Sequence, residues 1–216
     1  SATPDPDLSN NVDVATTHVR SRTWGSTSGG HNGDPVATAS GEFFFSLPDL
    51  MVLEGPMDLR FGLHYASLAT IGGGVASIFG PNWSHTWDWT LQADDPEQMV
   101  VRSPRGEVIT FREEGDAFVL LDSEYGYYQL VRDNGQFHFH DTYSDSVCTF
   151  NAAGQLVAMH DTRGASLVFT YTGQGWPATV SDGLGRVVAF NYVNGLPSNL
   201  SDGLRQVQFT FTDGLL

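Results

Sequence analysis

The sequence is poor in residues on which several classes of protein depend. Its 216 residues include one cysteine, Cys148, so no disulfide can form within the chain. Lysine and arginine together number 10 against 25 acidic residues, which gives a formal net charge of −15. Because nucleic acids and anionic membranes bind clustered positive charge, this balance argues against both as partners. No apolar run approaches the ~18 residues that a membrane-spanning helix needs.

Sequence signatures of common catalytic sites are also missing. The chain has no G-x-S-x-G nucleophile elbow, no H-E-x-x-H zinc signature and no G-x-x-x-x-G-K-[ST] phosphate loop. Cys148 lies in the alternating run SVCTF, which favours a small buried side chain over a nucleophile. Two carboxylates could meet in space for glycoside hydrolysis, but no particular pair is indicated. These motifs therefore indicate no particular catalytic, cofactor or metal site.

The residues that are abundant indicate an all-β protein with little or no helix. Aromatic residues make up 12% of the chain and glycine occurs 24 times, whereas helix formers dominate no long window. Residues 1–33 are polar and are expected to form a linker or N-terminal arm. Strands are expected from Asp34 onward, with breaks at Pro48 and at Gly55-Pro56. Asn134-Gly135 predicts a hairpin, since both central positions of its turn need positive φ.

The stretch NWSHTWDWTLQ, residues 82–92, alternates between aromatic and polar side chains. Read as one strand, it places Trp83, Trp87 and Trp89 on one face, together with His85, and Asp88 on the opposite, wetter face. Two interpretations remain open. The tryptophans form either a platform that stacks on a ligand such as a sugar, or a wall that packs against the protein interior.

One histidine pair has the spacing of metal ligands on a strand. His138 and His140 are two residues apart and therefore share a strand face. No third ligand is identifiable, so we expect them to be ordinary strand residues and expect no metal.

The second half of the chain repeats about every 21 residues. Aromatic positions are spaced by 21, 21 and 19 residues, and a glycine, an apolar residue and an aspartate recur with them. These positions are Phe150, Tyr171, Tyr192 and Phe211; Gly154, Gly175 and Gly195; Met159, Val180 and Leu200; and Asp161, Asp182 and Asp202.

Each repeat predicts a two-stranded hairpin that buries its aromatic face by stacking on the next. Phe169, Phe190 and Phe209 are expected on one side of one sheet, on neighbouring strands. The turn D-x-x-G ends in Gly164 and Gly185 and fails in the third unit, where Arg205 replaces the glycine.

The repeat resembles the YD-repeat of the Rhs family, which also occurs in teneurins and in the shell proteins of toxin complexes. FNAAGQLVAMHDTRGASLVFTY, residues 150–171, is similar to the family unit over its whole length. The naming dipeptide is replaced, for example by Phe150-Asn151 and Tyr171-Thr172. The upstream GDPVATASGE, GPM and FGPNWSH are similar to the segment that precedes the repeats in bacterial Rhs proteins.

The resemblance implies an N-terminal β region at 34–148 and about three repeat units at 149–216, the last one truncated. It implies a curved sheet of stacked antiparallel hairpins, part of a hollow shell around a C-terminal toxin or other cargo in a secreted or surface-displayed bacterial protein. It also implies that this segment is structural, with no catalytic residue, cofactor or metal of its own. The expected partners are the rest of the same polypeptide, in a longer protein, and other copies at exposed sheet edges. The alternative is a cell-surface adhesion or glycan-binding module.

Overall fold

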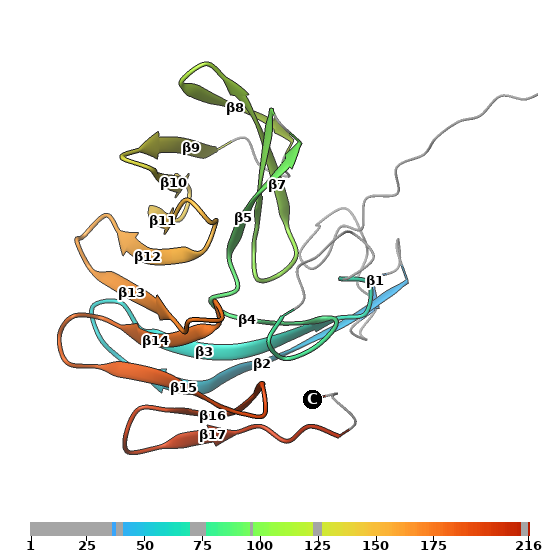
Figure 1. The fold of residues 1–216 in the computed structure, drawn as a ribbon, viewed down its shortest axis with the longest axis vertical. Helices are drawn as coiled ribbons and strands as arrows, with labels where there is room; N and C mark the ends of the chain where they lie inside the picture. Colours follow the sequence, from blue (N-terminus) through green and yellow to red (C-terminus); the bar gives the residue numbers. More distant parts are fainter. Residues whose placement is uncertain (1–35, 38–40, 70–76, 96, 123–126, 213–215) are drawn as a thin grey trace, which may run out of the picture.

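The computed structural model describes residues 36–37, 41–69, 77–95, 97–122, 127–212 and 216. In this part of the chain the protein is all-β, as the sequence predicts, with 17 strands in three antiparallel sheets and no helix (Figure 1). None of its described residues belongs to a helix suited to crossing a membrane. The expected linker at 1–33 lies outside the described residues.

The first sheet is dominated by a long hairpin. It has the order β1-β2-β3-β4 and contains β1 (Val36–Ala37), β2 (Glu42–Leu53), β3 (Leu59–Ala66) and β4 (Trp83–His85). The expected break at Pro48 is wrong. β2 continues through it as a bulge between Leu47 and Met51, where Asp49 takes φ 58° and the extra residues leave the ladder. The turn at Gly55-Pro56 is confirmed between β2 and β3.

The second sheet is a four-stranded meander with the order β5-β6-β7-β8. Its strands are β5 (Thr90–Asp95), β6 (Gln98–Arg102), β7 (Val108–Glu114) and β8 (Ala117–Asp122). The tryptophan-rich stretch therefore does not form one strand. β4 ends at His85, residues 86–89 turn, and β5 starts a different sheet at Thr90.

The third sheet has nine strands in sequence order. They are β9 (Tyr128–Asp133), β10 (Gln136–Asp141), β11 (Ser146–Phe150), β12 (Leu156–Asp161), β13 (Ser166–Tyr171), β14 (Pro177–Ser181), β15 (Val187–Val193), β16 (Leu196–Ser201) and β17 (Gln206–Gln208). Asn134 and Gly135 join β9 to β10 with φ of 48° and 79°, which confirms the predicted hairpin. β11 spans the boundary expected between residues 148 and 149.

The repeats stack as hairpins, with one correction. Phe169 on β13, Phe190 on β15 and Phe209 just beyond β17 pack into the same core, so they share one side of the sheet. They do not lie on neighbouring strands. β14 and β16 intervene and contribute Val180 and Leu200, because each unit supplies two strands to the sheet.

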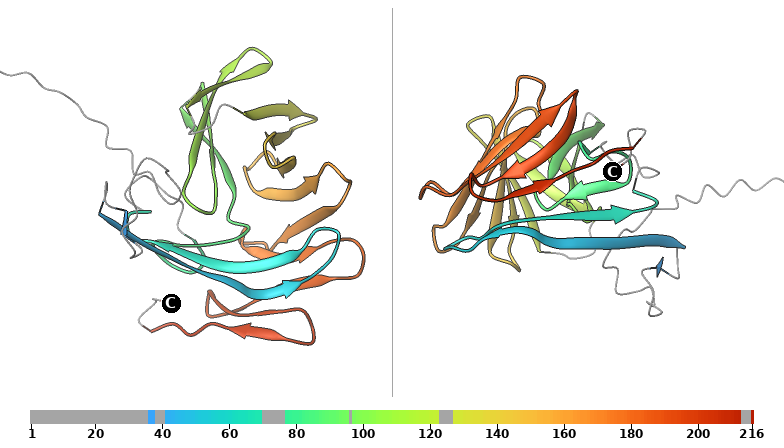
Figure 2. Two further views of the ribbon diagram at one scale, coloured as in Figure 1. Left: turned by 180° about the vertical axis from the view of Figure 1, so that it is seen from behind. Right: turned by 90° about the horizontal axis from the view of Figure 1, so that it is seen from below.

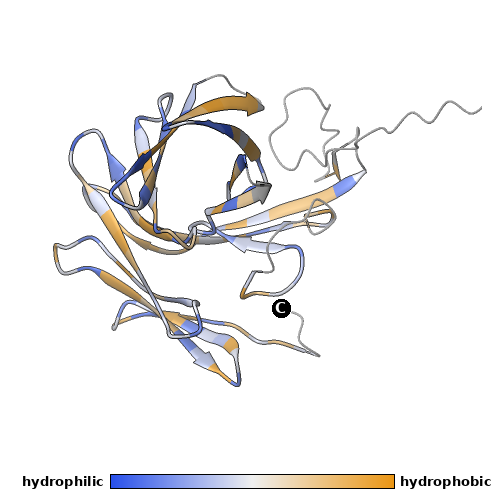
Figure 3. Ribbon diagram, turned by 45° about the horizontal axis from the view of Figure 1, so that its top comes forward, coloured by the Kyte–Doolittle hydropathy of each residue, from blue (hydrophilic) through white to orange (hydrophobic). Residues whose placement is uncertain are grey.

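The three sheets pack around one hydrophobic core. The β2–β3 hairpin lies along the repeats in both views (Figures 1 and 2). The second sheet and the first strands of the third curve into a ring, with alternating hydrophobic and hydrophilic residues (Figure 3). Its inward side chains are buried and include Phe111, Phe139 and Val101. An ion pair joins the second and third sheets: Arg132 Nη1 on β9 lies 2.8 Å from Glu113 Oε1 on β7.

Candidate functional site

The inner face of the repeats carries a ladder of aromatic side chains that the first sheet covers. The ring of Phe61 on β3 lies 5.9 Å from that of Phe190 and 6.1 Å from that of Phe209. Trp87 extends the contact to Phe169, at 6.1 Å between ring centroids. Such tilted and edge-to-face ring pairs stabilise the fold by more than the burial of their apolar area alone. At this end of the repeats, the β2–β3 hairpin therefore occupies the aromatic face that successive units present.

The tyrosines of the repeat make a recurring hydrogen bond. The hydroxyl of Tyr171 donates to the carbonyl oxygen of Leu156 at 2.6 Å, and that of Tyr192 donates to Pro177 at 2.8 Å. Both bonds reach back 15 residues to the first strand of the same unit. Burial is the main cause that raises the pKa of both phenols, so they remain donors at neutral pH. The aromatic position thus joins the two strands of its own unit.

The residue after the aromatic one caps a turn. Asn151 Oδ1 accepts hydrogen bonds from the backbone N–H groups of Ala153 and Gln155. Thr172 Oγ1 serves the equivalent turn in the second unit. In the third unit this position is Val193, whose side chain cannot accept a hydrogen bond. Its turn is a two-residue hairpin at Asn194-Gly195, with φ of 52° and 83°, and such a hairpin needs no side-chain cap. Loss of the aspartate that names the repeat therefore leaves these turns intact.

The aspartates of the repeat organise the opposite turns. In all three units the aspartate Oδ1 accepts bonds from two backbone N–H groups of the turn, and Oδ2 pairs with an arginine. Backbone N–H groups of Arg205 and Leu204 lower the pKa of Asp202 to about 2. The third unit departs from D-x-x-G, as its sequence shows, but its turn still forms. This turn is one residue shorter, with Gly203 at φ 89°, and Arg205 takes the place of Arg186.

Arg186 connects the repeats to the β2–β3 hairpin. Its Nε lies 2.8 Å from Oδ2 of Asp182, while its two other nitrogens donate to the carbonyls of Leu53 and Met57 at 2.6 and 3.0 Å. Gly55 lies against the guanidinium, since a Cβ at this position would fall 2.0 Å from Arg186 Nη2. Arg205 makes a similar bond to Val52 at 3.2 Å. No local sequence signal marks these contacts, which span 129 to 153 residues.

The three tryptophans do not form a common platform. Trp87 is 6% exposed and packs against Phe61, Phe169 and Phe190. Trp89 is half-buried beside Phe139 of β10, inside the ring that the second sheet forms with the first strands of the third. Trp83 is half-buried at the far end of the first sheet. Because the chain turns at 86–89, the three rings contact different parts of the protein and do not share one strand face.

Asp88 turns back toward His85, so its expected place on an opposite, wetter face is wrong. Its Oδ1 lies 3.0 Å from His85 Nε2, and Oδ2 accepts bonds from Ser77 Oγ and from the His85 backbone N–H. Trp87 N–H donates to His85 Nδ1 at 3.3 Å. The His85 side chain is almost fully buried between Phe61, Phe79 and Phe190. This network fixes the turn that carries the chain from the first sheet to the second.

The Asp88 network predicts acid-sensitive stability. Burial opposes ionisation of Asp88, but His85 and the hydrogen bonds outweigh it and lower the pKa of the carboxyl. A carboxyl whose pKa is lower in the folded state stabilises above its unfolded value of about 4 and loses this effect as the pH falls. We expect Asp88→Asn to cost about 2 kcal/mol at pH 7, with a difference from wild type that shrinks below pH ~4. Urea unfolding of the wild type and of Asp88→Asn between pH 7 and 3 measures the loss of stability and its dependence on pH. A difference in stability that stays constant over this range would contradict the role given to the Asp88 carboxylate.

Other chemically active side chains lie apart from one another. Cys148 is buried, and burial raises the pKa of its thiol to about 12, as the buried-residue interpretation requires. Ser46 Oγ contacts His64 Nδ1 at 2.7 Å across β2 and β3, but burial, with Arg105 nearby, lowers the pKa of His64 to about 4. Among the described residues, no three histidine, cysteine, aspartate or glutamate side chains gather as metal ligands.

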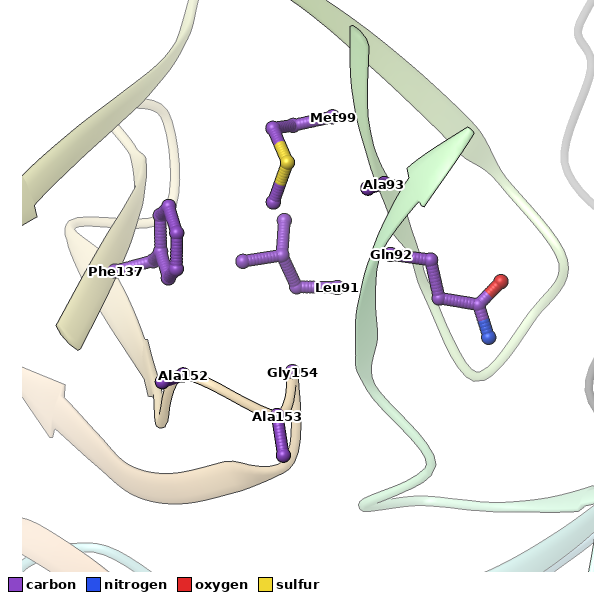
Figure 4. A pocket seen from close by; sticks show the side chains of 8 residues that line it. All are labelled: Leu91, Gln92, Ala93, Met99, Phe137, Ala152, Ala153 and Gly154. Atoms are coloured by element: carbon purple, nitrogen blue, oxygen red, sulfur yellow. The ribbon is translucent and has the colours of Figure 1, made fainter. Parts of the chain in front are cut away.

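A hollow of about 510 Å³ lies where the second sheet meets the first repeat (Figure 4). Its lining is mostly apolar and carries no ionisable side chain: Leu91, Gln92, Ala93, Met99, Phe137, Ala152, Ala153 and Gly154. The backbones touch here, since Leu91 N–H donates to Gly154 O at 3.1 Å. A Cβ on Gly154 would fall 1.9 Å from Leu91 O. Gly154 is thus needed for a close approach as well as for its turn.

Two family models match the chain. A domain of unknown function, DUF6531, covers residues 33–111, and the RHS repeat covers residues 150–187. The first includes the β2–β3 hairpin and the tryptophan-rich turn. The second includes the first two Asp–Arg turns. No curated protein matches the chain.

Proposed function

Because the chain belongs to the Rhs/YD-repeat family, we propose that it forms part of the wall of a β-shell that encloses a C-terminal toxin or other cargo domain of the same polypeptide. In this role the chain does no chemistry and needs no cofactor. RHS repeats are typical of extracellular or surface proteins, and we propose secretion from a bacterium.

One observation carries the proposal. The large side chains of successive repeats share one face of the sheet, and that face is turned toward the interior, where Phe61 and Trp87 meet it. Residues on the other face of the same strands, such as Val168 and Val187, are exposed. A sheet with one aromatic side and one solvated side, extended by similar hairpins, is suited to a wall between an enclosed space and water.

Protease protection in the complete gene product tests the enclosure. We expect the domain that follows the repeats to resist proteinase K at concentrations that digest the same domain produced alone. Equal digestion of the two forms would overturn the proposal. A variant that loosens the wall, such as Arg186→Met, should make the enclosed domain more sensitive.

A glycan-binding role is the second candidate, and an open aromatic cluster favours it. Trp83 packs edge-on against Phe45 and Tyr65, at 5.4 and 5.2 Å between ring centroids, and Phe43 beside them is 41% exposed. Exposed rings of this kind can stack on sugars. A glycan array with the wild type and Trp83→Ala tests it. Binding lost in the variant supports the role, and no binding by the wild type rejects it.

The last strand of the third sheet predicts self-association. β17 pairs with β16 on one side and is the terminal strand of the sheet. Terminal strands with unpaired N–H and C=O groups recruit other strands, while the charge of −15 opposes precipitation. We expect soluble dimers or larger species in sedimentation velocity, reduced by Gln208→Pro, which removes an N–H that points away from β16. A chain that stays monomeric at high concentration would contradict this.

A further inference from the structure

The outward face of β10 carries two histidines that the shell interpretation does not use. Their neighbours Phe137 and Phe139 are buried on the inner face, while His138 and His140 are half-buried on the other. Because side chains alternate along a strand, both imidazoles project to the same side, from Cα atoms about 6.5 Å apart. Imidazoles that project from Cα atoms at this separation can turn one nitrogen each toward a shared ion, at about 2.0–2.1 Å.

A neighbouring strand holds the ring of His138. Its Nδ1 lies 3.1 Å from Oγ1 of Thr149, which is directly opposite on β11. Thr149 is 4% exposed, so its hydroxyl is fixed by packing. In metal sites, a hydrogen bond to one imidazole nitrogen orients the ring and leaves the other nitrogen as the ligand. The contact with Thr149 therefore leaves Nε2 of His138 to bind a metal ion.

His140 projects from β10 between two uncharged neighbours. They are Gln129 on β9 and Val147 on β11, so no charged side chain lies directly opposite the ring on either strand. The chain's formal charge of −15 favours a cation over an anion.

We propose that His138 and His140 form a two-histidine site for a divalent transition-metal ion, which binds Cu²⁺ most tightly and Ni²⁺ and Zn²⁺ less tightly. No third histidine, cysteine or carboxylate completes a ligand set in the described part of the chain. Water fills the remaining positions, which are open to a ligand from another molecule. The oxygen-preferring ions Mg²⁺ and Ca²⁺ do not bind here.

Calorimetric titration of the chain with CuCl₂ at pH 7, together with electron paramagnetic resonance, tests the site. We expect one ion per chain with micromolar affinity and a spectrum with coupling to two imidazole nitrogens. His140→Gln should weaken binding at least about tenfold and remove one nitrogen from the spectrum, and Thr149→Val should weaken it up to about tenfold. His160→Gln is the matched control, since His160 is exposed on the same face of β12.

Unchanged binding in His140→Gln would overturn the proposal, as would equal loss in His160→Gln or only millimolar affinity in the wild type. Circular dichroism of each variant checks folding. MgCl₂ should give no binding heat, and a similar response to Mg²⁺ and Cu²⁺ would also contradict the imidazole site.

Discussion

Replacing Gly154 by alanine is expected to lower the stability of the protein by about 3 kcal/mol or more, roughly 6–12 °C in Tm. Two effects add. Gly154 has φ of 78°, where a Cβ costs about 1–2 kcal/mol. The new methyl group would also meet Leu91 O, so β5 and the first repeat turn must move apart. The hydrogen bond from Leu91 N–H to Gly154 O is then lost.

Gly164→Ala separates these two effects. Gly164 has φ of 88°, and no heavy atom lies within 4 Å of the Cβ that would be added. This variant should lose only the backbone term, about 1–2 kcal/mol. Thermal unfolding followed by circular dichroism measures both variants. Equal losses would show that the contact between Leu91 and Gly154 does not hold the second sheet to the repeats.

The second large effect is expected at Arg186. Arg186→Met removes both donors from the carbonyls of Leu53 and Met57 and leaves Asp182 without its ion partner. Each of these partly buried carbonyls that is left without a donor costs about 1 kcal/mol, and the broken ion pair adds to this. We expect a fall in Tm of about 5–10 °C, with faster hydrogen exchange in the β2–β3 turn than in β9–β11.

The other repeat arginines provide graded controls. The exposed fraction of the side chain is 21% for Arg186, 60% for Arg205 and 84% for Arg163. Arg205 makes one bond to β2, and Arg163 makes none that reaches the first sheet. Substitution by methionine should therefore destabilise in the order 186, 205, 163, with almost no effect at 163. A reversed or flat order would refute the role given to Arg186.

The features that the sequence predicts correctly depend on local rules. Alternation of side chains and the recurring glycines indicate the hairpins of the repeats, and Asn134-Gly135 indicates its own turn. Phe169 and Phe190 share a face because the period of a strand is fixed. The all-β class and the family follow from the same regularities.

The features that the sequence does not predict depend on distant partners. The tryptophan-rich stretch alternates like a strand, yet Thr86 pairs with Gly62 through its backbone and its side chain, and Asp88 turns back to His85. These bonds give the turn at 86–89 its shape. Arg186 looks like an ordinary turn residue until β2 is placed beside it. Gly154 fits a turn, but Leu91 lies 63 residues away.

An electron cryomicroscopy reconstruction of the complete gene product tests the central claim most directly. The account predicts a closed β-wall in which Phe169 and Phe190 face inward, the β2–β3 hairpin covers the first repeats, and density for a further domain fills the interior. A reconstruction in which the repeats form an open, extended stalk, with no enclosed space beside their aromatic face, would contradict it.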